Sequence, residues 1–113
     1  MSDCLFCRII RGEIPGKKVY EDDEALAIYD IAPAAPVHIL VMPKAHIVSI
    51  VDADNEQLAL ISRLHGIMRD LAVQHGISEG FRIVNNCGEQ GGQAVPHLHF
   101  HLLGGRSLNW PPG

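Results

Sequence analysis

Residues 97–103 read HLHFHLL, with a histidine at every second position and an apolar residue after each one. In an extended strand, successive side chains point to opposite faces, so the three histidines lie on one face and the apolar residues between them on the other. Grouping three imidazoles on a buried surface costs desolvation free energy. The alternation therefore predicts a strand whose apolar face packs on a core and whose histidine face forms a functional site.

Four other segments have the composition of strands. Each is short, apolar and bounded by turn residues, with an acidic stretch after the first and prolines around the third. These segments cover residues 19–20, 25–29, 37–42 and 81–85. With the histidine run they make five strands, and the short polar connections between them predict an antiparallel sheet.

A single long helix is predicted between the third and fourth strands. From Leu58 onward, apolar residues recur at steps of three or four, which is the period of an amphipathic helix. Asp54 is a suitable N-cap with Gln57 as its capping-box partner, and Gly76 is a typical stop. We therefore expect an α+β fold with one long helix and short helical segments, in a single domain over residues 1–113.

The composition limits the possible partners. The 113 residues carry a formal net charge of −4, which is poorly suited to a nucleic acid polymer, whereas a small anionic ligand needs only a few local donors. No apolar run approaches the roughly 18 residues of a membrane span, and the start MSDCLFCRIIRG lacks the long apolar stretch of a secretory signal. We expect a cytoplasmic protein that binds neither a nucleic acid polymer nor a membrane.

A polar loop precedes the histidines: residues 85–93 read NNCGEQGGQ. Its three glycines allow sharp turns that point backbone N–H groups at an anion. Two catalytic uses of the histidines remain open, because they could hold a catalytic metal or act on a phosphate as nucleophile and donors. The loop favours the phosphate.

The segment 93–103 resembles the signature of the histidine triad (HIT) family, in which histidines alternate with apolar residues. Further segments resemble the Hint branch of this family in their order and spacing. They are residues 13–15, 20–23, 29–31, 35–38, 42–46, 103–106 and the closing WPPG at 110–113. The resemblance spans nearly the whole chain. It implies the HIT-like five-stranded sheet and a homodimer whose subunits pair their sheets.

The resemblance to the Hint branch also implies an activity. It implies a nucleotide hydrolase or transferase that cleaves purine nucleoside phosphoramidates at the α-phosphate. The middle histidine would attack phosphorus and form a nucleotidyl-histidine, which water then hydrolyses. Positioned donors would stabilise the charge that spreads over the phosphate oxygens. The implied catalytic residues are His99 as nucleophile, His101, His97 and, on a neighbouring strand, His38.

The nucleotide would be bound by residues on both sides of the histidines. Asp30 corresponds to the carboxylate that accepts the ribose hydroxyls, and Asn86 to a polar contact near ribose and phosphate. Besides His99, we expect His101, the Gly92 backbone and the Gln93 side chain to contact the phosphate. The implied apolar slot for the base comprises Phe6, Ile9, Ile28, Tyr29 and Ile31. Plain core packing accounts for these apolar residues equally well.

One position departs from the Hint pattern. A serine that can contact the phosphate or leaving group usually stands two residues after the last loop glycine, and this chain has Ala94 there. A methyl group neither donates nor accepts a hydrogen bond, so the leaving group would take its proton from elsewhere. We expect slower turnover or a shifted leaving-group preference. Ala94 also keeps a third hypothesis open, a nucleotide-binding interaction module with little turnover.

The N-terminal segment contains the pair Cys4 and Cys7, and the chain has three cysteines. In a reducing compartment, thiols or metal ligands are favoured over disulfides, but two cysteines alone do not complete a zinc site. HIT proteins that open with this pair are similar in binding zinc through both cysteines, a Pro-Lys-x-His histidine and the first triad histidine. The resemblance therefore implies a structural zinc held by Cys4, Cys7, His46 and His97, and no organic cofactor.

Overall fold

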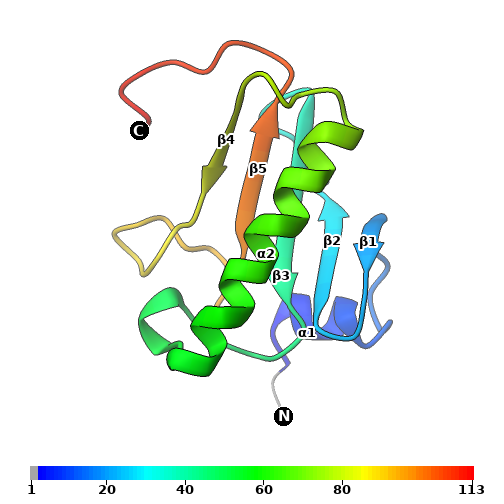
Figure 1. The fold of residues 1–113 in the computed structure, drawn as a ribbon. Coiled ribbons are helices and arrows are strands. Elements are labelled where there is room, and N and C mark those ends of the chain that lie inside the picture. The colour runs from blue at the N-terminus through cyan, green and yellow to red at the C-terminus, as the bar shows by residue number, and fades with distance from the viewer. Residues whose placement is uncertain (1–2) are drawn as a thin grey trace.

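A five-stranded antiparallel sheet forms the centre of the molecule in a computed structural model that describes residues 3–113 (Figure 1). The strands are β1 (Lys18–Glu21), β2 (Ala25–Tyr29), β3 (Val37–Pro43), β4 (Phe81–Val84) and β5 (Phe100–Gly104), in the order β1-β2-β3-β5-β4. The helical elements are α1 (Leu5–Ile10), the short 3-10 helix η1 (Ile50–Asp52) and the long α2 (Asn55–Gln74). The predicted α+β fold class is confirmed.

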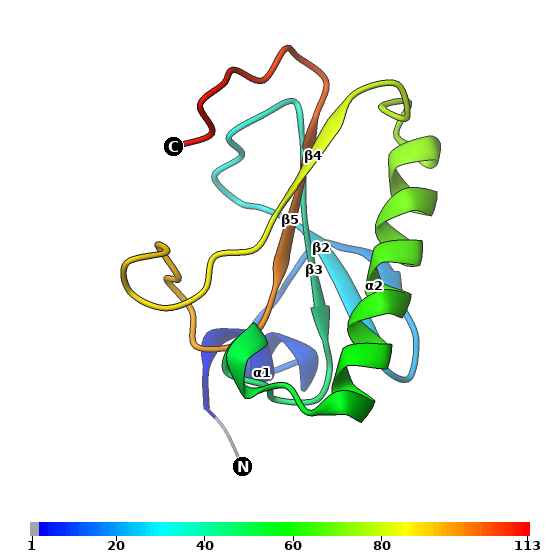
Figure 2. The ribbon, with the colours of Figure 1, turned by 60° about the vertical axis from the view of Figure 1, so that its left-hand side comes forward.

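The helices α1 and α2 lie on opposite faces of the sheet (Figure 2). On one face, Leu64 and Met68 of α2 belong to the same core cluster as Val41 of β3. On the other face, Phe6 of α1 packs in a second cluster with Leu40. Because neighbouring residues of a strand point to opposite faces, β3 is buried on both sides, which explains its nearly continuous run of apolar residues.

The histidine run is only partly a strand, so the prediction of a strand over residues 97–103 is wrong at its start. β5 begins at Phe100. Before it, Leu98 donates its N–H to the Ile47 carbonyl (N···O 2.6 Å) instead of to β3. In a continued register Leu98 would face Pro43, which has no N–H to donate. The alternation of faces persists, because Leu98 and Phe100 both pack in the core under α2.

The long helix has the predicted ends. The Asp54 carboxylate accepts the N–H of Gln57 (2.8 Å), and the Gln57 side-chain oxygen accepts the N–H of Asp54 (3.0 Å), which completes a capping box. Gly76 follows the helix with a φ of +71°, a left-handed conformation that glycine adopts without strain. Within residues 3–113, no helix combines the length and the apolar character needed to cross a membrane.

Candidate active site and metal centre

A cavity of about 290 Å³ opens on the α1 side of the sheet. Its walls are mainly apolar, and one carboxylate and two imidazoles line it, those of Asp30, His99 and His101. The other predicted nucleotide-binding residues that line it are Phe6, Ile9, Ile28, Tyr29 and Ile31. The cavity is also lined by apolar residues that were not predicted to contact the nucleotide: Leu5, Ile14, Pro15, Leu40 and Val95. An apolar cavity with a few convergent polar groups is typical of small-molecule sites.

The two ring nitrogens of His99 have different roles. Nδ1 lies 2.7 Å from the carbonyl oxygen of His97. A carbonyl only accepts hydrogen bonds, so Nδ1 carries the hydrogen, and in the neutral ring Nε2 carries a lone pair. The ring of Phe6 packs edge-on against the imidazole, with centroids 4.9 Å apart. His99 is therefore a buried imidazole with a fixed tautomer and a nucleophilic Nε2.

A chain of hydrogen bonds also fixes the tautomers of His38 and His101. The backbone N–H of Ala34 donates to Nδ1 of His38 (3.0 Å), so the hydrogen of the neutral His38 ring is on Nε2. This Nε2 lies 2.9 Å from Nδ1 of His101 and donates to it. The neutral His101 ring must then carry its own hydrogen on Nε2. His101 thus presents an N–H donor, where His99 presents a lone pair.

The electrostatics favour the neutral rings of His38 and His101. Burial lowers the pKa of His38, although the nearby Asp30 charge opposes this. Burial, together with the charges of His99 and His38, lowers the pKa of His101 to about 4. Geometry supports the same conclusion, because a doubly protonated His38 would lose its bond from Ala34. At neutral pH the pair therefore acts as a relay of hydrogen bonds without a positive charge.

Asp30 completes the polar side of the cavity. Its Oδ1 accepts the N–H of Ala32 (2.8 Å), and its Oδ2 lies 3.5 Å from Nε2 of His38. The side chain is 19% exposed, so it reaches both the histidine relay and the solvent-accessible cavity. An ionised carboxylate accepts hydrogen bonds only and has lone pairs to spare. This arrangement suits a ligand that offers hydroxyl groups.

Three predicted nucleotide contacts, Asn86, Gly92 and Gln93, are not among the described residues that line this cavity. The Gln93 side chain accepts the N–H of Gly88 (2.9 Å) and donates to the carbonyls of Val48 (2.6 Å) and Val95 (3.0 Å). The N–H of Gly92 donates to the carbonyl of Glu89 (3.0 Å). The two expected phosphate donors therefore have partners within the protein, where Gln93 ties the loop to the segment around Val48.

One polar contact of the site was missed by the sequence analysis. The side chain of Asn85, the residue after β4, donates to the carbonyl of His99 (3.0 Å). It holds the backbone of His99 from the β4 side. The antiparallel register, which pairs Val84 with His101, brings Asn85 opposite the histidine run. This register would have identified the Asn85 contact, but the register cannot be read from the sequence alone.

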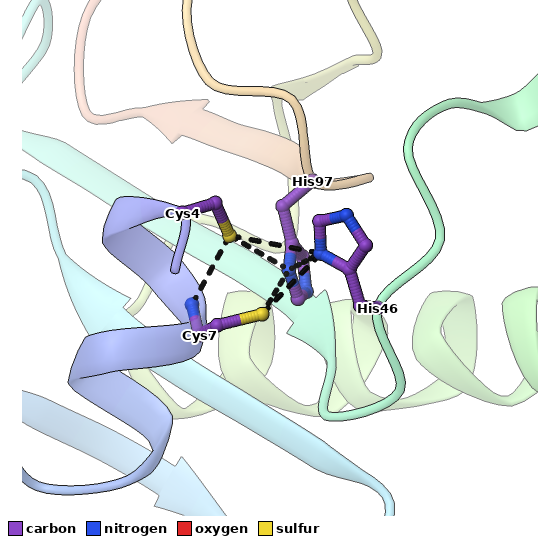
Figure 3. Close-up of side chains that lie close together, drawn as sticks. All are labelled: Cys4, Cys7, His46 and His97. Carbon is purple, nitrogen blue, oxygen red and sulfur yellow. Dashed lines mark hydrogen bonds between the residues drawn. The ribbon is translucent and has the colours of Figure 1, made fainter. Parts of the chain in front are cut away.

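Four side chains next to the cavity form a candidate metal centre, and they are drawn in Figure 3. Ligand atoms of Cys4, Cys7, His46 and His97 all lie within 4.8 Å of one another. Nε2 of His97 donates to the Pro43 carbonyl (2.8 Å), so its Nδ1 carries a lone pair. This Nδ1 lies 3.4 Å from the sulfur of Cys4 and 3.5 Å from that of Cys7. The structure thus brings together all four predicted ligands, from α1, the segment after β3 and the histidine run.

The distances fit a tetrahedral zinc site. Zn–S bonds of about 2.3 Å and Zn–N bonds of about 2.0–2.1 Å give S···N edges of about 3.5 Å and N···N edges of about 3.3 Å in a tetrahedron. The two sulfurs lie 3.7 and 3.3 Å from Nδ1 of His46, and the two Nδ1 atoms are 3.2 Å apart. Burial lowers the pKa of His97, which keeps the ring neutral, as a ligand must be. Four protein ligands leave no open position, which is typical of a structural site.

The geometry does not support a catalytic metal shared by His97, His99 and His101. The Nδ1 atom of His97 faces the cysteines, and that of His99 is bonded to a carbonyl. Asp30, His38 and His101 do approach one another within 4.8 Å. However, Nε2 of His38 carries a hydrogen because Nδ1 is occupied by the Ala34 N–H, so it has no lone pair for a metal.

Comparison with known proteins identifies the family. Residues 11–108 match the HIT domain, which is well over half of the chain. The chain belongs to the HIT domain family. The matched part of this HIT domain contains Asp30, His99, His101 and the two histidines of the metal centre, whereas Cys4 and Cys7 precede it.

Several known proteins are similar to this chain in sequence or in structure. The crystal structure of a HIT family hydrolase from Legionella pneumophila is similar, with a TM-score of 0.96 and 47% identity over 98% of this chain and 100% of that one. A 14 kDa zinc-binding protein of Brassica juncea is 48% identical over 113 residues, which is 98% of this chain and 100% of that protein. Adenylylsulfatase HINT1 of Arabidopsis thaliana is 46% identical over 114 residues, covering 99% of this chain and 78% of the plant protein.

Proposed function

We propose that this HIT domain is a nucleotide hydrolase that cleaves purine nucleoside phosphoramidates at the α-phosphate, with His99 as the nucleophile. The observation that carries the proposal is the tautomer of His99, whose Nε2 has a lone pair because Nδ1 donates to the His97 carbonyl. A neutral imidazole nitrogen is nucleophilic near pH 7. The cavity of about 290 Å³ suits one mononucleotide better than a larger ligand.

The reaction proceeds in two displacements. Nε2 of His99 attacks phosphorus, the phosphorus–nitrogen bond of the substrate breaks, and the amine leaves with a proton taken from water. The Nδ1–H of the nucleotidyl-histidine stays bonded to the His97 carbonyl, which stabilises the positive charge of the ring. Water then attacks phosphorus, the nucleotide leaves, and one proton passes to solvent. The neutral ring is restored.

The neighbouring polar groups orient the substrate. The Nε2–H of His101 donates to a phosphate oxygen, and the relay through His38 keeps that hydrogen on Nε2. Asp30 accepts hydrogen bonds from the ribose hydroxyls, and the apolar walls around Ile28 pack against the base. A donor whose orientation is already set by the protein needs little reorganisation in the transition state.

The direct test is intact-mass analysis after brief exposure to an adenosine phosphoramidate. We expect a covalent adduct of nucleotide size that forms within the first turnover and decays as water hydrolyses it. A chain that turns the substrate over with no adduct under rapid quenching would contradict the covalent mechanism. Binding of AMP without turnover would instead favour the nucleotide-binding module.

The His38 relay predicts a specific effect on catalysis. His38→Ala removes the donor to Nδ1 of His101, so the His101 hydrogen can move away from the phosphate. We expect kcat to fall about 10- to 100-fold, with a smaller change in KM, as for other residues that orient a catalytic group. Steady-state kinetics of the purified variant measure this split. His38→Gln retains an amide donor and should recover part of the loss, and equal losses in both variants would contradict the relay.

A second substrate class is favoured by one relative and one residue. The Arabidopsis relative is named an adenylylsulfatase. In this chain, Ala94 lines the cavity where a hydroxyl could have protonated the leaving group. Sulfate leaves from an adenylyl sulfate as a stable anion and needs no proton, whereas an amine does. We therefore propose adenylyl sulfate as an additional substrate of the same His99 chemistry.

The Ala94→Ser variant separates these two substrates. A serine hydroxyl at the cavity wall can donate to a departing amine, so kcat/KM for an adenosine phosphoramidate should rise about three- to tenfold. The same variant should leave kcat/KM for adenylyl sulfate within about twofold, because its leaving group needs no donor. Parallel steady-state assays with both substrates check this. An equal rise for both would show that the hydroxyl acts on binding rather than on the leaving group.

We propose that the metal centre binds a structural zinc ion through Cys4, Cys7, His46 and His97. The support comes from the tetrahedral spacing of the four ligand atoms and from the soft thiolate ligands, which zinc accepts readily. When bound, the ion supplies a cross-link between α1 and the sheet and no chemistry at phosphorus. Thiolate ligation requires reduced cysteines, which agrees with the cytoplasm as the compartment that we propose.

We also propose that two copies of the chain pair through β4. This strand is at one edge of the sheet, where its outer backbone groups have no neighbouring strand within the described sheet, and Phe81 on it is 38% exposed. Antiparallel pairing of two β4 strands would join the two sheets. Sedimentation equilibrium should give twice the chain mass of 12.4 kDa. A mass of one chain at micromolar concentration would contradict the dimer.

A further inference from the structure

The short helix α1 belongs to both the metal centre and the cavity. Cys4, which is its N-cap, and Cys7 point sulfur atoms at the metal centre, while Leu5, Phe6 and Ile9 line the cavity. A helix of six residues is far below the roughly 12–15 residues at which helices become marginally stable on their own. Its position therefore depends on the metal centre and on the apolar contacts of Phe6 and Ile9 with the sheet.

Phe6 contacts a metal ligand and the nucleophile at the same time. Its ring is edge-on to His97, with centroids 6.0 Å apart and an interplanar angle of 87°. It is also edge-on to His99, at 4.9 Å and 76°. The side chain is 4% exposed and lies between the two cysteines in sequence, so a metal that holds both cysteines fixes the Phe6 ring against both imidazoles.

A second connection runs through the residue His97 itself. Nδ1 faces the cysteine sulfurs and Nε2 donates to the Pro43 carbonyl. A metal bound at Nδ1 would therefore complete the fixation of the ring at both nitrogens. The backbone carbonyl of the same residue accepts the Nδ1–H of His99. The group that sets the tautomer of the nucleophile is therefore part of a metal ligand. The adjacent Leu98 is also bonded to Ile47, the residue after His46.

We propose that Phe6 is a positioning residue that, together with the His97 carbonyl, couples the occupancy of the metal centre to His99 and to nucleotide binding. The coupling goes beyond the proposed function and depends on it only where a nucleotide is used as a probe. By thermodynamic linkage, the metal and the nucleotide then raise each other's affinity by the same factor. We expect a factor of about ten, within the common range of roughly 5–150.

The first experiment measures zinc affinity on the intact chain by competition with a chromogenic chelator, with and without saturating AMP. Zinc should bind about tenfold more tightly when AMP is present. Phe6→Leu keeps apolar bulk but removes the ring, so it should still bind one zinc. In this variant AMP should raise the zinc affinity by a factor below about three. Ile10→Val, on the same helix but outside the cavity, should keep the tenfold factor. If the unmodified chain binds AMP, equal zinc affinities with and without AMP would overturn the proposal, and so would the same ratio of affinities in Phe6→Leu as in the unmodified chain.

The second experiment needs no nucleotide. Nitrogen-15 NMR of zinc-loaded protein should show the His99 ring with a protonated Nδ1 and an unprotonated Nε2. In zinc-loaded Phe6→Leu we expect mixed tautomers, and in Ile10→Val the unmodified pattern. Identical His99 spectra in all three proteins would overturn the role of Phe6. A chain that fails to bind AMP but shows the Phe6 effect on His99 would contradict the proposed function and leave the coupling of the metal centre to His99 intact.

Discussion

The His99→Ala variant should lose the nucleotidyl adduct completely and at least about 10³-fold in kcat/KM for an adenosine phosphoramidate. The reason is that Nε2 of His99 supplies the attacking lone pair, and the neighbouring His101 cannot replace it. Its ring accepts from His38 at Nδ1 and carries a hydrogen on Nε2, so neither nitrogen offers a lone pair to phosphorus. Intact-mass analysis and steady-state kinetics on the same preparation measure both losses.

Two controls make this result specific. His65→Ala removes another histidine, an exposed one on α2 that does not line the cavity, and should retain the adduct and nearly full activity. AMP binding to His99→Ala, measured by calorimetry, should stay within about tenfold of the unmodified chain, because the cavity walls remain. Persistence of the adduct in His99→Ala would mean that another side chain is the nucleophile.

The same assay separates the covalent mechanism from a metal-dependent hydrolase. If a catalytic metal activated water, a chelator would abolish turnover and no adduct would form with or without metal. In the covalent mechanism, chelated protein that remains folded by circular dichroism still forms the adduct, although more slowly because its affinity for the nucleotide substrate is lowered. The geometry around His38 already disfavours the catalytic metal.

The second large effect concerns stability. Cys4→Ser combined with Cys7→Ser should remove bound zinc and lower Tm by about 15 °C. At a zinc concentration about a thousandfold above its dissociation constant, binding adds about 4 kcal/mol to the free energy of unfolding. For a domain of this size, 1 kcal/mol corresponds to about 4 °C in Tm. Metal analysis and calorimetric unfolding of zinc-loaded proteins measure the two changes together.

The third cysteine offers a matched control for this variant. Cys87 is half-buried in the loop after β4 and is not part of the metal cluster. Cys87→Ser should therefore retain one zinc per chain and a Tm within a few degrees of the unmodified value. If the double variant lost its zinc without a change in Tm, the metal would not be structural. If it kept one zinc per chain, the four ligands would be wrong.

The fold was largely predictable because its signals are local. The capping box at Asp54 and Gln57 joins residues three apart, and the stop at Gly76 depends on one residue type. The start of β5 was not predictable in the same way. It depends on the Ile47 carbonyl, which accepts the Leu98 N–H, so that this N–H does not bond to β3. Ile47 and Leu98 are far apart in the sequence.

The candidate site was predictable in part. Most of the residues expected to bind the nucleotide line the cavity, but Asn86, Gly92 and Gln93 do not. The four predicted metal ligands lie within 4.8 Å of one another. The resemblance could not reveal that the Gln93 amide is hydrogen-bonded to backbone groups, nor that Asn85 donates to the His99 carbonyl. Both facts follow from how the loop before the histidines packs on neighbouring segments.

By itself, the sequence determined the α+β fold class, the ends of the long helix, and the alternation that separates the histidines from the apolar core. Only the tertiary structure decided what each histidine can do. His97 faces the cysteines, His99 has a lone pair and His101 has a donor because their ring nitrogens meet Pro43, the His97 carbonyl and His38. The state of an imidazole depends on the partner of each nitrogen, and two of these three partners lie on a distant part of the chain that only folding brings near.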